Sequence, residues 1–283
     1  MLPGPPGLRF LTSRGPRINR FVHRVAKTAS YSWWRPVRAL RRELGLEEGA
    51  SPLFAGKYSP HLNLALFSRE LQPPQPDWPA HTIQTGFLFH DEARAAVLPH
   101  SVADFLRAGE PPLVFTLGSA AVQLPGSYYE ESAAAALALG RRALLLLGRN
   151  PRPVGLPPSI FAWDYLPYAA IFPHAAAVVH QGGVGTTAQT MRAGRPMLVM
   201  PFAHDQFDNA ARVTRLGIGR EIARRSYRRD RVANELRILL NDPRYHETAT
   251  EIGRRIRDEK PEELACAALE RVIGGFNAAL PVK

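Results

Sequence analysis

The segment from Val178 to Asn209 reads VVHQGGVGTTAQTMRAGRPMLVMPFAHDQFDN, an apolar strand, a glycine-rich turn, a helix start and a second apolar strand that leads to an acid-amide pair. Gly182, Gly183 and Gly185 carry no side chain that would block close approach, so backbone N–H groups and the N-terminus of the following helix can face a phosphate. Open α/β sheets bind ligands at the edge where such turns emerge. The segment therefore predicts an anion site beside a polar site of sugar size.

Strand and helix patterns alternate around this segment, from Pro112 to the C-terminus. A buried strand, PLVFTLG, ends in a glycine turn, and a helical tail is expected from Arg231 to Val272. Strands separated by helices of this length predict an α/β fold with a doubly wound parallel sheet. The other expected strands are ALLLLG at Ala143, SIFAW at Ser159, AVVH at Ala177, PMLVMP at Pro196 and GIGREI at Gly217.

The residues before this pattern are organised differently. An amphipathic helix is expected around Val37 to Leu46, and a strand from His61 to Ser68. Residues 72–79, QPPQPDWP, cannot form regular structure because proline lacks a backbone N–H, and they indicate an interdomain linker. The sequence is accordingly divided into residues 1–108 and residues 109–283.

The net charge of +11 comes from the N-terminal arm, because residues 1–42 hold ten Lys and Arg and no Asp or Glu. From residue 43 onward, 26 basic residues face 25 acidic ones, so we expect no nucleic-acid partner. The arm fits a solvated basic segment, and it also has the Arg-rich look of an organelle transit peptide. A third interpretation is peripheral membrane contact through residues 1–42, with Trp33 and Trp34 as interfacial anchors.

The single cysteine, Cys266, excludes an intramolecular disulfide and suits a reducing cytosol, so a cytoplasmic protein is expected, with this thiol buried. No apolar run reaches the about 18 residues that a membrane helix needs. A soluble protein with 45% apolar residues and well-formed cores is therefore predicted.

Polar side chains around the glycine turn favour a ligand site. His180 ends the strand, and Thr186 and Thr187 stand near the helix start, where hydroxyls cap the helix or reach phosphate oxygens. Asp205 and Gln206 together accept and donate hydrogen bonds, which suits adjacent sugar hydroxyls. Two simpler interpretations stay open: the glycines let the helix pack closely on the sheet, and Asp205 caps the helix that follows it.

Two further patterns bear on the kind of ligand. FAWDYLPY, from Phe161 to Tyr168, places aromatic rings after another strand, where they either stack on a planar base or fill the core. Gly183, Gly185 and Ala188 match the dinucleotide-binding fingerprint, but three strands precede them, whereas that fingerprint normally follows the first strand. The sequence has no HxxxH spacing and no DxD pair, so no metal site is expected.

With these residues in view, the chain resembles the C-terminal half of the family 1 glycosyltransferases with the GT-B fold, of the bacterial type that modifies macrolides, glycopeptides and sterols. The likeness covers roughly Pro111 to Val272 and is most specific in HQGGVGTT and RAGRPMLVMPFAHDQFDNA, which look like the family's donor-site signature. It implies that residues 109–283 form a nucleotide-sugar donor-binding domain with a helical tail. Residues 1–108 would be a remnant of the acceptor-binding domain plus a proline-rich linker.

The resemblance also implies roles for individual residues. Asp205 and Gln206 match the pair that holds the donor sugar, and Tyr165 and Tyr168 lie in the stretch that recognises the nucleobase. Plant members carry a glutamate for the ribose where this chain has Ala188, and Gln189 is the candidate substitute. The residues matched to the donor diphosphate are Ser119, His180, Gly182, Gly183, Gly185 and Thr186.

The family transfers a hexose from a UDP- or dTDP-linked donor to a hydroxyl of a small lipophilic acceptor, with inversion and without a cofactor. Here His180 and the helix N-terminus would stabilise the leaving diphosphate in place of a metal. The family's base histidine lies in N-terminal sequence that this chain lacks, so no catalytic residue is assigned. Three hypotheses follow: a glycosyltransferase whose recorded start is too far downstream, a truncated donor-binding remnant, or a nonenzymatic protein whose basic arm binds membrane or polyanion.

Overall fold

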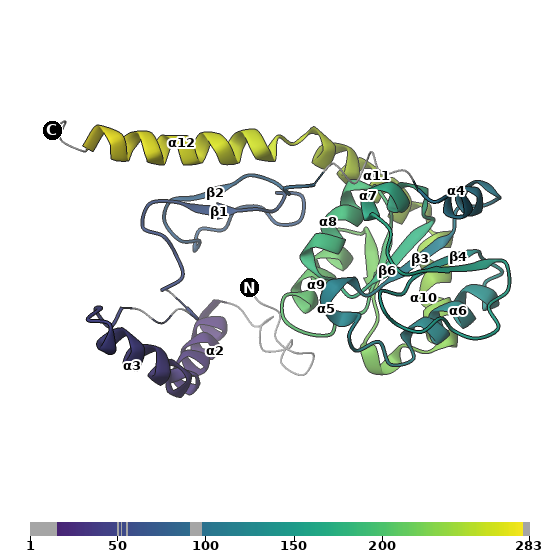
Figure 1. Ribbon diagram of the computed structural model, residues 1–283, viewed down its shortest axis with the longest axis horizontal. Coiled ribbons are helices and arrows are strands. Elements are labelled where there is room, and N and C mark those ends of the chain that lie inside the picture. The colour runs from purple at the N-terminus through teal and green to yellow at the C-terminus, as the bar shows by residue number, and fades with distance from the viewer. Residues whose placement is uncertain (1–15, 50, 52, 55, 91–97, 280–283) are drawn as a thin grey trace. The chain divides into compact units, whose positions relative to one another are not determined.

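The computed structural model of the protein describes residues 16–279 except 50, 52, 55 and 91–97 (Figure 1). The chain divides into two compact units, each made of several segments. The larger unit comprises Leu66–Pro73 and Thr85–Glu262, and the smaller unit comprises Met1–Ala65, Pro74–Gln84 and Glu263–Lys283. These units do not follow a single boundary near residue 108. The assignment of the two halves as acceptor remnant and donor domain remains a prediction.

The larger unit is built on a six-stranded sheet in the order β5-β4-β3-β6-β7-β8 (Figure 1). All neighbouring strands are parallel, and Leu113 of the central strand β3 is in register with Ala143 on one side and Ala177 on the other. The predicted doubly wound parallel sheet is confirmed, and each strand expected between residues 112 and 222 is present. The strands are β3 (Leu113–Thr116), β4 (Ala143–Leu146), β5 (Ile160–Trp163), β6 (Ala177–His180), β7 (Met197–Val199) and β8 (Gly219–Glu221).

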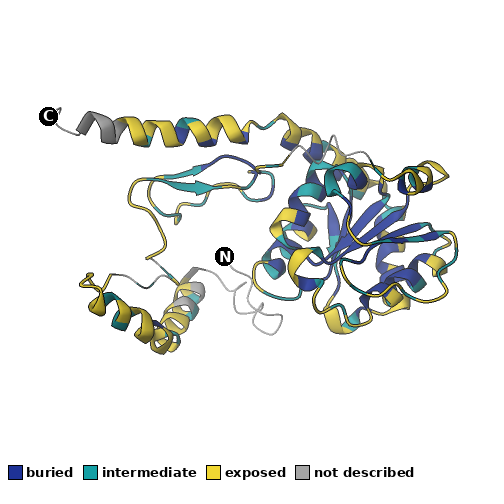
Figure 2. Ribbon diagram, in the orientation of Figure 1, coloured by how far each residue is buried: buried dark blue, intermediate teal, exposed yellow. Residues whose placement is uncertain are grey.

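Helices cover both faces of this sheet, so its central strands are buried (Figure 2). Phe115 and Val179 pack into one apolar cluster, and their neighbours Val114 and Val178 pack into another. Alternate residues of a strand point to opposite faces, which explains why these strands read as continuous apolar runs. One cluster includes residues of α6 (Tyr128–Ala138) and α10 (Arg229–Asn241); the others include residues of α4 (His100–Arg107), α7 (Tyr168–Ile171), η4 (Phe172–His174), α8 (Val184–Arg192), α9 (Gln206–Arg215) and α11 (Pro243–Asp258).

The expected helical tail is three helices instead of one: α10, α11 and α12 (Pro261–Ala279). Both interruptions coincide with a proline, which fits the first turn of a helix but cannot continue one. Asp242 precedes Pro243 and its side chain accepts a hydrogen bond from the Arg244 backbone N–H, capping α11. The remaining short elements of the larger unit are α5 (Gly118–Ala121) and η5 (Arg224–Ser226).

The smaller unit contains the helices α2 (Pro16–Ala29), η2 (Tyr31–Trp34) and α3 (Arg35–Glu43) and the parallel pair β1 (Asn63–Ala65) and β2 (Thr82–Gln84). Most of the basic arm from residue 17 to residue 42 is exposed helix, while residues 1–15 lie outside the described residues. No described helix is long and apolar enough to cross a membrane. Membrane-surface contact through residues 1–42 stays a prediction.

Two side chains of the smaller unit are placed otherwise than expected. Trp34 is buried, so of the two tryptophans only Trp33, with 74% of its surface exposed, could act as an interfacial anchor. Cys266 was expected inside the protein but is exposed. The reason is helical phase, because Ala265 and Ala268 of α12 are buried and Cys266 lies on the adjacent, outward face.

Gly253 lies where α11 crosses the end of α8. A Cβ atom there would come within 2.7 Å of the Met191 carbonyl oxygen and 2.8 Å of the Gly194 Cα, which are backbone atoms. We expect Gly253→Ala to lower the free energy of unfolding by about 1–3 kcal/mol, since overpacking outweighs the about 1 kcal/mol that alanine contributes to a helix. Denaturant unfolding measures this change. Gly274→Ala, where a Cβ meets no atom within 4 Å, should not lower stability.

Candidate functional site

The strand order places a topological switch point at the carboxyl edge of the sheet, between β3 and β6, and this position is here called the crevice. The chain leaves β3 toward β4 and leaves β6 toward β7, which lie on opposite sides of this central pair. The two loops therefore part, and open α/β sheets bind ligands at such a switch point. The segments that reach this edge are residue 117 and the start of α5 after β3, residues 181–183 after β6 and residues 200–205 after β7.

The turn after β6 is held in shape by Gly182. Its φ of 87° is a conformation that favours glycine, and a Cβ at this position would lie 2.7 Å from the Val199 Cγ1. Gly183 then occupies the N-cap position of α8, and no side chain caps this helix. The N–H groups of a first helical turn have no partner within the helix and carry its positive dipole end. Anion binding at this turn remains a prediction, and the uncapped start of α8 is the feature on which it rests.

His180 lies beneath this turn and is fully buried. Its Nδ1 accepts a hydrogen bond from the Gly182 N–H at 3.0 Å, and its Nε2 lies 3.3 Å from the Met197 sulfur. Burial lowers the pKa of His180 to about 3, so the ring is neutral. Both ring nitrogens thus face protein atoms and support the turn. Contact between His180 and a diphosphate remains a prediction.

The acid-amide pair follows β7 and is linked to the glycine turn by Asn209. The Asn209 Nδ2 donates to the Gly182 carbonyl oxygen at 2.8 Å and to the Asp205 Oδ2 at 2.9 Å. Asp205 is exposed at the start of α9 and its side chain makes no capping hydrogen bond, which removes the simpler interpretation of this residue. The Gln206 Oε1 accepts from the backbone N–H groups of Phe202 and Ala203, at 2.8 and 3.1 Å.

The two threonines of the turn have different environments. Thr186 hydrogen-bonds to Tyr168, whereas the Thr187 Oγ1 is buried with no partner among the described residues. The Tyr168 hydroxyl also lies 2.8 Å from the Thr116 Oγ1 at the end of β3. Burial raises the pKa of Tyr168, which therefore stays neutral. This hydroxyl ties the end of β3 to the first turns of α8, on the floor of the crevice.

The aromatic residues expected at a nucleobase are not equivalent. Tyr165 has 73% of its surface exposed, while the Tyr168 ring stacks on Phe172 with a centroid distance of 4.5 Å. Tyr165 is therefore the ring with a face open to a ligand. Ser119 is exposed in α5, at the end of β3, and Gln189 is half-buried on α8.

Two residues of the site were missed from the sequence. Asn209 joins the turn to the acid, as described above. Gln181 follows the strand residue His180, is buried, and its Oε1 has no hydrogen-bond partner among the described residues. The sequence signal was present as the polar residue between the strand and the glycines, but a sequence does not show which of two adjacent polar side chains points into a crevice.

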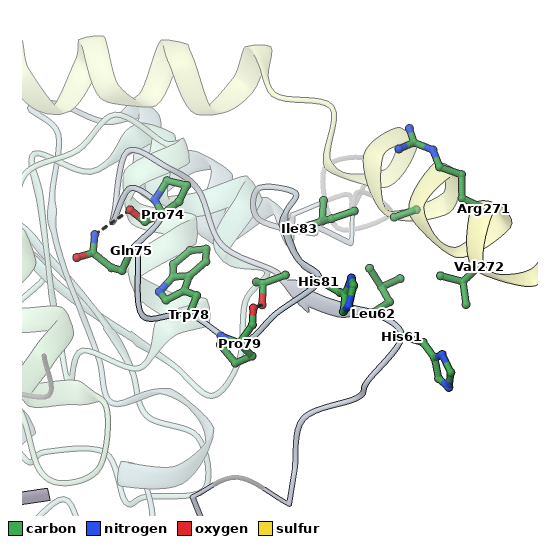
Figure 3. Close-up of a pocket in the computed structure, with 12 residues that line it drawn as sticks. His61, Leu62, Pro74, Gln75, Trp78, Pro79, His81, Ile83, Arg271 and Val272 are labelled. Atoms are coloured by element: carbon green, nitrogen blue, oxygen red, sulfur yellow. Dashed lines mark hydrogen bonds between the residues drawn. The ribbon is translucent and has the colours of Figure 1, made fainter. Parts of the chain in front are cut away.

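A separate cavity of about 430 Å³ lies in the smaller unit (Figure 3). It contains none of the residues predicted for the donor site, and Figure 3 shows Trp78, His81 and Ile83 around it together with Arg271 of α12. The described part of the chain has no group of three or more His, Cys, Asp or Glu side chains placed to hold a metal ion. The residues predicted for the donor site all belong to the larger unit.

Comparisons of sequence and of structure both relate this chain to glycosyltransferases. The family described as erythromycin biosynthesis protein CIII-like, C-terminal domain, matches residues 145–270. O-mycaminosyltylonolide 6-deoxyallosyltransferase of Streptomyces fradiae is 34% identical over 268 residues, which are 93% of this chain. The solved structure of the glycotransferase of kitacinnamycin is 25% identical and superposes with a TM-score of 0.76 over 90% of this chain and 67% of that one.

A further solved structure, glycosyltransferase VinC in complex with dTDP, is 26% identical, with a TM-score of 0.51 over 62% of this chain and 44% of that one. The chain spans 63% of the length of the Streptomyces fradiae transferase. The sequence matches and the structural matches point to the same family, and the six-stranded parallel sheet fits it. The chain belongs to the family 1 glycosyltransferases of the GT-B fold.

Proposed function

We propose that this chain binds a nucleotide-sugar in the crevice between β3 and β6 and takes part in transfer of its hexose to a hydroxyl of a small lipophilic acceptor. The observation that carries this proposal is the uncapped N-terminus of α8 beside the exposed carboxylate of Asp205, linked through Asn209. The first feature suits a diphosphate and the second a sugar hydroxyl. The Streptomyces fradiae relative is named a 6-deoxyallosyltransferase, and VinC is described with dTDP, which supports a UDP- or dTDP-linked donor.

The proposed chemistry is inversion at the anomeric carbon. The acceptor hydroxyl attacks that carbon and loses its proton to a base, while the nucleoside diphosphate leaves with the electrons of the broken bond. We assign the base to no residue of this chain. The N-terminus of α8 would stabilise the charge that develops on the leaving diphosphate, which is the work a metal ion does in other enzymes.

Gly185 tests the diphosphate position. A Cβ there meets no atom within 4 Å, so Gly185→Ala should leave the melting temperature unchanged or higher. We expect it to weaken UDP and dTDP binding about tenfold or more, because the methyl group occupies the space over the first turn of α8. Isothermal titration calorimetry measures both affinities, with Gly274→Ala as the matched control. Unchanged affinity would place the diphosphate elsewhere.

Asp205 tests the sugar position. Asp205→Ala should lower the affinity for UDP-hexose or dTDP-hexose about tenfold, since a hydrogen bond to a charged group contributes about 1.5–3 kcal/mol. The affinity for UDP or dTDP without a sugar should stay near the wild-type value. Calorimetric titrations of both ligands with both proteins give the ratio. A parallel loss for the free nucleotide would show that Asp205 does not act on the sugar.

Metal independence is tested by titration in the presence of EDTA and, separately, of Mg²⁺. We expect the same affinity for UDP and dTDP in both, because the N–H groups of α8 supply the positive end that balances the diphosphate. Binding that requires Mg²⁺ would contradict the proposed metal independence. The proposed sugar contact would still be tested separately, by Asp205→Ala.

A further inference from the structure

Two helices of the smaller unit expose apolar stripes that no described residue covers. On α2, Phe21 and Val25 are one helical turn apart and have 67% and 51% of their surfaces exposed. On α3, Val37, Leu40 and the C-cap residue Leu44 follow the i, i+3, i+7 spacing of one helix face and are also exposed. Exposed positions predominate along both helices (Figure 2). Single apolar side chains on a surface need no explanation, but an aligned row on each of two consecutive helices indicates an interaction surface.

A row of cations runs beside each apolar stripe. The cations of α2 are spaced three, four and three residues apart, and those of α3 three and four apart, so each set lies on one side of its helix. They are Arg17, Arg20, Arg24 and Lys27 on α2, and Arg35, Arg38 and Arg42 on α3. Within the described residues none of these cations forms an ion pair, and residues 1–42 contain no Asp or Glu. The polar faces of both helices are therefore strongly basic.

The 3-10 helix η2 connects α2 to α3 and exposes one tryptophan. Trp33 has 74% of its surface exposed, whereas Trp34 is buried. The Arg38 guanidinium lies over the Tyr31 ring, 4.5 Å from its centroid, and donates to the Tyr31 hydroxyl at 2.6 Å, which ties η2 to α3. A tryptophan side chain combines a large apolar ring with an N–H donor and favours the boundary between water and hydrocarbon.

An apolar stripe beside a row of cations matches an anionic bilayer better than the other possible partners. A polyanion would use the cations but leave the apolar stripes and Trp33 in water. A second copy of this chain would bring cations of the same sign together. A bilayer of anionic phospholipid presents phosphate groups directly above hydrocarbon, within the about 5–10 Å that an amphipathic helix reaches.

We propose that α2, η2 and α3 lie in the surface of an anionic phospholipid membrane. Phe21, Val25 and Trp33 contact the hydrocarbon boundary, and the Arg and Lys side chains contact the lipid phosphates. This membrane surface, residues 16–44, contains none of the residues proposed for the donor site, so the inference does not depend on the proposed function.

The full chain should bind vesicles that contain phosphatidylglycerol and should not bind vesicles of phosphatidylcholine alone. Raising the NaCl concentration from about 0.1 M to about 1 M should weaken binding, because the Debye length falls from about 10 Å to about 3 Å. Co-sedimentation with sucrose-loaded vesicles measures the bound fraction. Equal binding to both kinds of vesicle would overturn the proposal.

Arg20→Gln combined with Arg24→Gln tests the row of cations. Each cation near an anionic surface contributes about fivefold to partitioning, so the double variant should bind phosphatidylglycerol vesicles about thirtyfold more weakly. Both side chains are exposed, so the helix content measured by circular dichroism should not fall. The matched control, Arg225→Gln combined with Arg237→Gln, removes the same charge from exposed arginines of the larger unit and should change binding less than about twofold. Equal losses in the two double variants would contradict the assigned surface.

Phe21→Ser tests contact with hydrocarbon. It should weaken binding about tenfold, because the ring no longer leaves water when the helix binds. Trp33 gives a second readout that does not require this variant to fold. The difference between the emission spectra of the wild type and Trp33→Phe should shift to shorter wavelength on phosphatidylglycerol vesicles, since the indole leaves water. Bound protein whose difference spectrum does not shift would place Trp33 in water and overturn the proposed insertion.

Other partners would give distinct results. A dimer in sedimentation equilibrium that is lost in Phe21→Ser, without vesicle binding, would identify a second copy as the partner and overturn the proposal. Binding to heparin without binding to vesicles would overturn it in favour of a polyanion. The affinities for UDP and dTDP should be the same in the wild type and the Arg20, Arg24 double variant, so a failure of the donor site is distinguished from a failure of this surface.

Discussion

The covering of both faces of a parallel sheet is the constraint on which the site depends. With helices packed on either side, the strands of the larger unit leave only the ends of the sheet open. Among those ends, the position between β3 and β6 is where successive connections turn away from each other. A ligand that needs backbone N–H groups and several loops at once can find them together only there.

The groups that could stabilise an anion at this edge of the sheet are dipoles without net charge. The crevice is formed by helix N–H groups, threonine and tyrosine hydroxyls and amides, with the Asp205 carboxylate exposed at its rim. His180 is kept neutral by burial, which lowers its pKa to about 3. Fixed dipoles of this kind need no proton from solvent and no reorganisation when charge develops on a leaving group. These groups are the basis of the proposal that the donor site works without a metal.

Much of this could be predicted from the sequence, for specific physical reasons. Buried parallel strands are continuous apolar runs, and glycines directly after a strand indicate a turn with positive φ. The strands β3 to β8 and the turn at Gly182 were therefore predictable. The orientation of neighbouring polar side chains could not be predicted. His180 is the last residue of β6 and Gln181 follows it, so the alternation of side chains along a strand no longer applies. Asn209 was missed because it lies a full helical turn beyond Asp205 and acts across to the Gly182 carbonyl.

The prediction for Cys266 was wrong because the burial of a single residue depends on helix phase. The sequence of α12 does not fix this phase, since small residues occupy several of its faces.

The division of the chain into units also differs from the single boundary that was expected. Leu71 and Phe87 pack with Met191 and Ile252 in the core of the larger unit. Both come from segments that the proline-rich pattern had assigned to the other half.

This interleaving makes the larger unit a discontinuous domain. Residues 66–73 and 85–262 complete it, and Ser68 donates to the Glu259 Oε1 at 2.6 Å across 191 positions of sequence. A fragment cut at residue 109 would lose Leu71 and Phe87 and leave Glu259 without this partner, exposing apolar surface along α8 and α11. The larger unit therefore begins at residue 66, and the two ends of its chain are joined by a hydrogen bond that either fragment alone would lack.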